Sequence, residues 1–214
     1  AVVMTERQEW SVSSDGPRVY LDLEWTGQAH TEVRIGEYDY GGLFIRAPWE
    51  PGTRAEVANT ARQRDENAEG KRAMWLDLGI QLDGADDMSH IAVFDHPQNR
   101  NFPQSWRVDG QFGVGPSASR LGAIVLEEGE ELVFRHRLVL YEGERNDVEL
   151  TDAWKAYSGQ GGTWALWGLA QREGREAEFL TPERAVENMT LQEGFNMNVF
   201  ASEPMITQPM AFCW

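Results

Sequence analysis

The chain has few of the residues that form covalent links or bind metal ions. Its 214 residues include one cysteine, Cys213, which excludes an internal disulfide framework and a cysteine metal cluster. Four histidines are scattered along the sequence without the tight spacing of a copper site, namely His30, His90, His96 and His136. The sequence therefore predicts neither a metal ion nor a cofactor.

Long apolar runs and basic residues are also scarce. No apolar run reaches the roughly 20 residues that cross a bilayer, and the first residues do not form a basic and apolar signal region. Nineteen Lys and Arg stand against 35 Asp and Glu, for a net charge of -16. Because this field repels nucleic acid and anionic membranes, we expect neither nucleic acid binding nor direct membrane insertion of this segment.

Aromatic residues are plentiful, and alternating apolar and polar residues predict strands with one buried face. The nine Trp and nine Phe suit both half-buried sheet faces and sugar-stacking platforms. Period-two alternation is clearest in residues 18–25, 74–82 and 132–140, and shorter strands are predicted at 9–13, 32–35, 43–46, 90–94 and 122–126. Many short strands without helical periods predict an all-β fold, an antiparallel β-sandwich over residues 1–158. His136 lies inside one of these strands and is interpreted as structural.

Other segments interrupt this pattern. Residues 48–71 predict a long loop over the sheet surface. Residues 147–157 predict a short helix, capped by Asn146 or Asp147, whose buried face carries Trp154. A linker is expected at 159–175, and a second short helix at 181–188. The apolar ending predicts that the last segment is a truncated part of a further domain.

The stretch from Phe94 to Trp106 is the strongest candidate for a site. It combines Asp95, His96 and Asn99 with two prolines, which exclude a regular helix or a central strand. A polar loop leaving a buried strand is where a β-scaffold usually carries its chemistry. The alternative is a wide turn with local side-chain to backbone bonds and His96 at the surface.

Two motifs together resemble a known bacterial family. Residues 40–46 read Tyr-Gly-Gly-Leu-Phe-Ile-Arg, and residues 95–99 read Asp-His-Pro-Gln-Asn, followed by Pro103 and Trp106. In this order they resemble the C-terminal half of the methane-oxygenase PmoA-like domain of unknown function, over about residues 5–158. The resemblance implies an incomplete sandwich similar to that of sugar mutarotases, and hence a sugar ligand. The soluble, β-rich pattern and the histidine spacing disfavour a metal oxygenase.

The last residues resemble a second family. Residues 193–204 and 209–214 are similar to the opening of a membrane-bound dehydrogenase of the sorbosone-dehydrogenase-like type, a β-propeller often followed by a haem module. The resemblance implies that residues 176–214 begin such a propeller. It also implies a dehydrogenase or haem module as a partner in the same polypeptide, and a periplasmic or extracytoplasmic location.

Two functions are compatible with these observations. In the first, a carbohydrate-active domain uses His96 as general acid or base, Asp95 to orient it and Arg46 to hold a sugar hydroxyl or carboxylate. The substrate would be bound by Asn99, Trp106, Tyr40 and Trp49. In the second, the domain is a noncatalytic carbohydrate-binding or docking module, which needs the aromatic residues but no proton shuttle. The catalytic hypothesis requires His96 and Arg46 to converge on one face.

Overall fold

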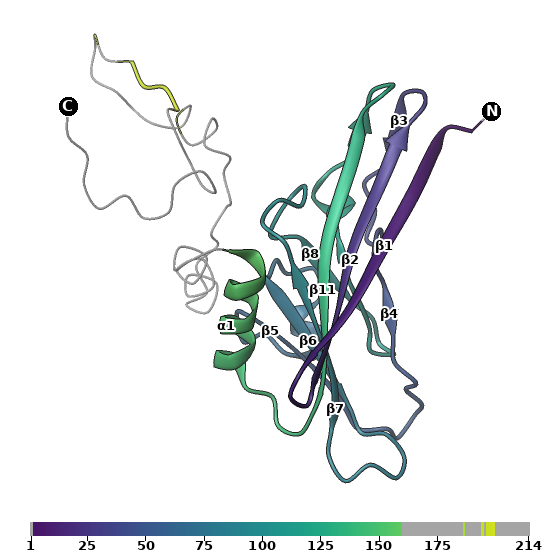
Figure 1. Cartoon of the computed structure of the whole chain (residues 1–214), viewed down its shortest axis with the longest axis vertical. Helices are drawn as coiled ribbons and strands as arrows, with labels where there is room; N and C mark the ends of the chain where they lie inside the picture. Colours follow the sequence, from purple (N-terminus) through teal and green to yellow (C-terminus); the bar gives the residue numbers. More distant parts are fainter. Residues whose placement is uncertain (1, 160–185, 187–193, 195, 200–214) are drawn as a thin grey trace. The chain divides into compact units, whose positions relative to one another are not determined.

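The structure is a computed structural model and describes residues 2–159, 186, 194 and 196–199 (Figure 1). The chain divides into two units, Ala1–Ser158 and Gly159–Trp214. The first unit is an all-β, sandwich-like fold with antiparallel sheets and one α-helix, which confirms the predicted fold class. The expected linker, second helix and propeller segment lie outside the described residues, apart from a few isolated positions, and stay predictions.

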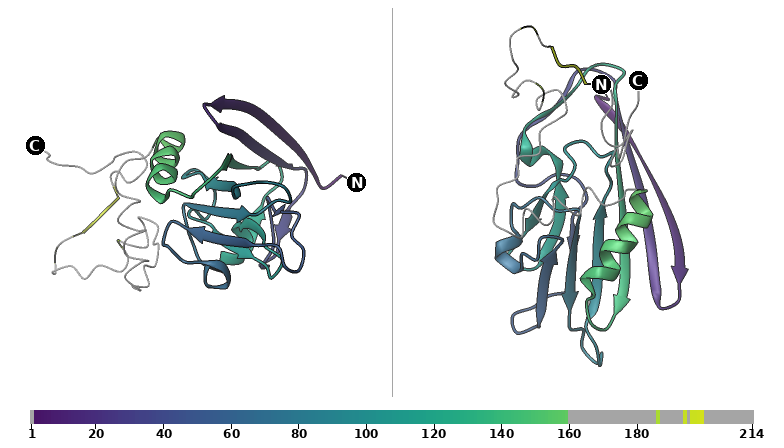
Figure 2. Two further views of the ribbon diagram at one scale, coloured as in Figure 1. Left: turned by 90° about the horizontal axis from the view of Figure 1, so that it is seen from below. Right: turned by 90° about the vertical axis from the view of Figure 1, so that its left-hand side faces the viewer.

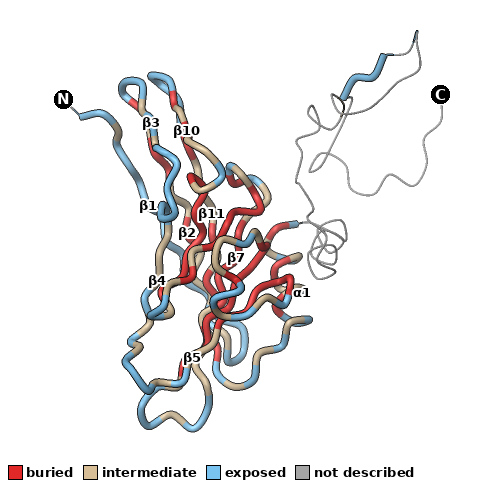
Figure 3. Tube along the Cα trace, turned by 180° about the vertical axis from the view of Figure 1, so that it is seen from behind, coloured by how far each residue is buried: buried red, intermediate tan, exposed pale blue. Residues whose placement is uncertain are grey.

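A six-stranded antiparallel sheet forms the main layer. Its strands lie in the order β1-β2-β11-β7-β6-β5. Their bounds are Met4–Asp15, Arg18–Ala29, Glu131–Glu142, Ser89–Asp95, Trp75–Ile80 and Ala55–Asn59, in that order. Buried residues are concentrated in the central strands, whereas β1 at the edge is exposed along nearly all of its length (Figure 3).

Two smaller sheets cover one face of the main sheet. One has the order β4-β9-β8, with bounds Ile45–Arg46, Gly113–Ser117 and Ser105–Val108, and the other pairs β10, Ile124–Leu126, with β3, Val33–Ile35. Short 3₁₀ helices occupy Asp65–Ala68 and Ala118–Leu121. The core between the layers packs Leu76, Leu78 and Val93 of the main sheet against Trp106 and Val114. Burial of these apolar side chains is the main stabilising contribution.

The helix α1, Asp147–Ser158, covers the opposite face of the main sheet (Figure 2, right). Its Thr151 accepts a hydrogen bond from the Trp75 indole, and its Tyr157 contacts Phe94. Trp75 and Phe94 alternate along their strands with Leu76 and Val93, which face the smaller sheets, so α1 must lie on the other side. The helix packs through buried Trp154, as predicted.

The residues predicted to form a long surface loop are more ordered than the sequence suggested. Residues 48–71 contain β5, which pairs with β6 at the edge of the main sheet, and the 3₁₀ helix Asp65–Ala68. Val57 of β5 is fully buried in the core. The strand was missed because its five residues include Glu56 and Asn59 and show no clear alternation.

Candidate functional site

A groove lies between the main sheet and the smaller sheets. Its volume is about 420 Å³, and its floor comes from β1, β2 and β11. Its lining residues are mostly apolar and aromatic, with a few polar groups: Met4, Glu6, Gln8, Trp10, Leu23, Trp25, Ile35, Gly41, Gly42, Leu43, Phe44, Gln104, Pro116, Ala118, Ser119, Ile124, Phe134 and His136. Such a composition is typical of small-molecule sites.

The strand register places the floor residues in a row. Trp10 pairs with Leu23, Leu23 pairs with His136, and His136 pairs with Asp95. Paired residues point to the same face of a sheet. The row therefore runs from the exposed indole of Trp10 to the fully buried carboxyl of Asp95.

Three rings form an aromatic strip along the floor. Trp25 lies 5.9 Å from Phe134 between ring centroids, and Phe134 lies 6.4 Å from His136 in a stacked arrangement. Glu6 accepts a hydrogen bond of 2.9 Å from the Trp25 indole, which holds this ring in place. The half-buried rings of Trp25 and Phe134 offer a ligand apolar surface at a fixed position, whereas His136 is only 3% exposed.

The 41–44 segment forms the opposite wall. Gly42 has φ 103°, a conformation that favours glycine. A Cβ atom on Gly115 of β9 would overlap the Leu43 carbonyl, so glycine is needed where the two chains approach. The glycine pair Gly41-Gly42 thus lets this segment lie against Pro116 of β9 and Ser119.

Asp95 organises the loop behind the groove. Its carboxylate accepts hydrogen bonds of 2.7 Å from the Asn99 side chain and from the Gln104 amide. Burial raises the pKa of Asp95 to about 7, and these hydrogen bonds and the Arg72 charge offset only part of that increase. Side-chain to backbone bonds therefore hold the loop, as the alternative interpretation expected, but Asn99 is turned inward and His96 is half-buried and not at the surface.

His136 is a buried titratable group on the groove floor. Its Nδ1 atom lies 3.9 Å from Oδ1 of Asp95 and has no hydrogen-bond partner of normal geometry among the described residues. Burial lowers the pKa of His136 to about 4, which the nearby Phe94 carbonyl opposes only in part. The imidazole is therefore neutral near pH 7.

The structure does not bring His96 and Arg46 together. The His96 ring contacts Tyr157 of α1 edge-on, on the helix side of the main sheet, and its Nδ1 accepts a bond from the Gln98 amide. Burial, with a smaller contribution from the Arg135 charge, lowers the pKa of His96. Arg46 lies in the three-stranded sheet on the other side, where it is exposed and pairs with Asp109 at 3.1 Å.

The predicted substrate-binding residues also lie apart from the groove. Tyr40 accepts a hydrogen bond from Arg107, and Trp49 donates one to the Thr53 carbonyl. Trp106 offers no stacking face because it is fully buried in the core, where its indole donates to the Ala73 carbonyl. Asn99 is buried and bonds to the Arg135 backbone, which fixes the loop to β11.

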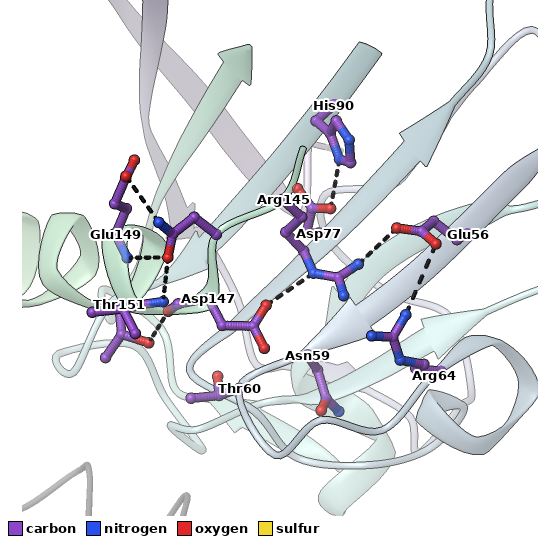
Figure 4. A network of polar contacts seen from close by, with 12 residues as sticks. Glu56, Asn59, Thr60, Arg64, Asp77, His90, Arg145, Asp147, Glu149 and Thr151 are labelled. Atoms are coloured by element: carbon purple, nitrogen blue, oxygen red, sulfur yellow. Dashed lines mark hydrogen bonds and ion pairs between the residues drawn. The ribbon is translucent and has the colours of Figure 1, made fainter. Parts of the chain in front are cut away.

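A second polar cluster lies on the helix side of the sheet (Figure 4). The buried Asp77 carboxylate accepts bonds of 2.8 Å from His90 and 2.7 Å from Tyr141. Nearby, Arg145 forms ion pairs of 2.9 Å with both Glu56 and Asp147, linking β5 to the start of α1. All of these groups are satisfied by one another, which is typical of a structural network.

Comparison with known proteins identifies the family. Residues 1–155 match DUF6807, which is described as a family of unknown function. The chain belongs to DUF6807. No curated protein and no solved structure matches it. The two resemblances seen in the sequence stay predictions, and the groove and the polar clusters described above all lie within the DUF6807 region.

Sequence reasoning missed most residues of the groove in this DUF6807 domain. Alternation in 132–140 places Phe134 and His136 on one face, and it could have marked His136 as facing inward with the aromatic residues. Strand order could not be read from the sequence, so the proximity of β1, β2 and β11 was not predicted.

Among the described residues no group of three or more His, Cys, Asp or Glu could hold a metal ion, and no helix could span a membrane.

Proposed function

We propose that the domain binds a carbohydrate in the groove. The observation that carries this proposal is the pair of half-buried rings of Trp25 and Phe134 beside the exposed polar side chains of Glu6 and Gln8. Pyranose rings offer an apolar face for stacking and hydroxyl groups for planar polar partners, and this pairing of surfaces matches both. A groove of about 420 Å³ can hold a monosaccharide or a short oligosaccharide.

Binding without catalysis agrees best with this geometry. The predicted shuttle of His96 and Arg46 does not converge, since the two residues lie on opposite sides of the main sheet. Asp95, the carboxyl next to His136, is fully buried and does not line the groove. The docking-module hypothesis therefore becomes the preferred one.

The binding test compares two tryptophans. Neutral hexoses, hexuronates and their disaccharides are titrated by calorimetry into the wild type, Trp25→Ala and the control Trp49→Ala, whose indole lies outside the groove. We expect at least one sugar to bind and Trp25→Ala to lose about 1–3 kcal/mol of binding free energy, comparable with other aromatic stacking contacts. Loss of binding in Trp49→Ala alone, or no binding of any sugar, would reject the groove as the site.

A second candidate is catalysis by proton transfer at His136. It is favoured by one observation, the adjacent Asp95 and His136 with pKa values shifted in opposite directions. Anomer exchange of each bound sugar is followed by NMR in the wild type, His136→Phe and His96→Ala. Turnover that His136→Phe abolishes, with binding retained, would support this candidate; turnover lost only in His96→Ala would restore the site predicted from the sequence.

A further inference from the structure

Within the described part of the chain, β1 is a long sheet edge with no strand on its outer side. It pairs only with β2 among the described elements, and eleven of its twelve residues are exposed. Trp10 is 47% exposed and Val12 is 70% exposed. Natural sheets usually protect such an edge with proline, charged side chains, a bulge or a covering segment, because it can pair with another strand. The β1 sequence contains neither proline nor lysine, and its charges at Glu6, Arg7 and Glu9 restrict which strand can pair with it.

The free hydrogen-bonding groups of this edge belong to the even-numbered residues. The Val3 carbonyl accepts a hydrogen bond of 2.9 Å from the His30 amide, which continues the β1–β2 ladder. In an antiparallel strand, residues that bond to one neighbour alternate with residues that face the other side. The amides and carbonyls of Glu6, Gln8 and Trp10 therefore point away from β2 and remain available to another strand.

The charges on β1 are complementary to those of a second, antiparallel β1 strand in one register. In an antiparallel pair of two β1 strands, a two-fold axis perpendicular to the sheet relates the copies, so that paired residues lie on the same face. One residue near the centre of β1 then lies at the axis, opposite the same residue of the second copy. With Arg7 or Glu9 on the axis, like charges stand opposite each other, which is destabilising. With Trp10 on the axis, Glu9 stands opposite Ser11 of the partner subunit and gains no unlike charge. With Gln8 on the axis, Arg7 of each copy stands opposite Glu9 of the partner subunit, so only this register pairs unlike charges.

We propose that the protein forms a symmetric dimer in which β1 pairs antiparallel with β1 of a second copy, with Gln8 on the two-fold axis. The two six-stranded sheets then join into one. On the groove side, Trp10 of the partner subunit stands opposite Glu6, and Val12 of the partner subunit stands opposite Met4. Both Met4 and Glu6 line the groove, so the second copy extends its open wall.

The charge arrangement is tested by sedimentation equilibrium of the full chain in about 0.15 M salt, where the repulsion between two copies of net charge -16 is screened beyond roughly 8 Å. Arg7→Glu and Glu9→Arg each place like charges opposite each other. We expect each to raise the dimer dissociation constant on the order of tenfold. The double swap restores unlike charges and should restore the dimer, whereas Arg62→Glu, at an exposed arginine outside β1, should have no effect.

The register is tested separately by cross-linking in a Cys213→Ser background. Gln8→Cys places two thiols across the axis, where paired Cα atoms lie about 5.5 Å apart, within the range that disulfides span. Ser11→Cys is the control, because it stands opposite Thr5 of the partner subunit. We expect a disulfide dimer only with Gln8→Cys. A wild type that is monomeric at all concentrations, a dimer insensitive to both charge reversals, or equal cross-linking of both cysteines would overturn the proposal.

Discussion

Asp95 and His136 stand opposite each other on β7 and β11, with Oδ1 and Nδ1 3.9 Å apart and both side chains buried. Burial raises the pKa of the acid to about 7 and lowers that of the base to about 4. Each group is therefore shifted toward its neutral form, as expected where two ionisable groups share an apolar environment. This pair links the loop that Asp95 organises to the floor of the groove.

The first prediction concerns the pH dependence of stability. Because the folded pKa of His136 lies near 4 and its ordinary value is 6.5, its contribution is present above pH 6.5 and is lost as the pH falls toward 4. That loss is on the order of 3 kcal/mol. Asp95 acts oppositely, since a raised pKa adds stability as the pH falls from about 7 to about 4.

His136→Phe removes only the acid-sensitive contribution. Relative to the wild type, this variant should gain stability as the pH falls from 7 to 4, measured as the free energy of unfolding in urea. His30→Phe is the control, because it makes the same substitution at an exposed histidine outside the buried pair. A His136→Phe profile parallel to that of the wild type would contradict the burial-driven pKa shift.

The second prediction concerns the buried network at Asp77. Asp77→Ala leaves His90 and Tyr141 without the carboxylate to which both bond, so it should cost about 3–5 kcal/mol of unfolding free energy. Asp152→Ala removes a carboxylate from an exposed pair with Lys155 and should cost under about 1 kcal/mol. Chemical denaturation of both variants measures the difference; comparable costs would argue against the structural role of Asp77.

The third prediction concerns the buried hydrogen bonds of the Asn99 side chain. Its side chain bonds to Asp95 and to both backbone groups of Arg135, so Asn99→Ala should cost about 2–4 kcal/mol of stability by leaving buried groups unpaired. The neighbouring Gln98→Ala changes an exposed side chain and should be nearly neutral. If Asn99 instead serves as a ligand contact, its alanine variant will fold as stably as the wild type and lose only sugar binding.

Local patterns predicted the elements better than their arrangement. Alternation indicated β2, β6 and β11. The sequence also predicted the cap and the apolar face of α1, and in the structure Asn146 accepts hydrogen bonds from the first helical amides. The site depended on strand order, which local patterns do not encode. His96 and Arg46 were grouped because both lie in polar or glycine-flanked segments, but the sheet between them separates the two. Trp10, Trp25 and His136 are brought together only by the register of three strands.

The last prediction concerns the wall of the groove. A methyl group at Gly115 would overlap the Leu43 carbonyl, and because that atom belongs to the backbone, the 41–44 segment must move. Gly115→Ala should therefore cost about 1–3 kcal/mol of stability, as overpacking does elsewhere, and should weaken any ligand of the groove. Gly110→Ala is a matched control, since no atom lies within 4 Å of the position its methyl group would occupy. Denaturation and calorimetric titration of both variants test the prediction. A stable Gly115→Ala variant with unchanged binding would show that the segment is not held against β9 as described, and that the wall of the groove can rearrange freely.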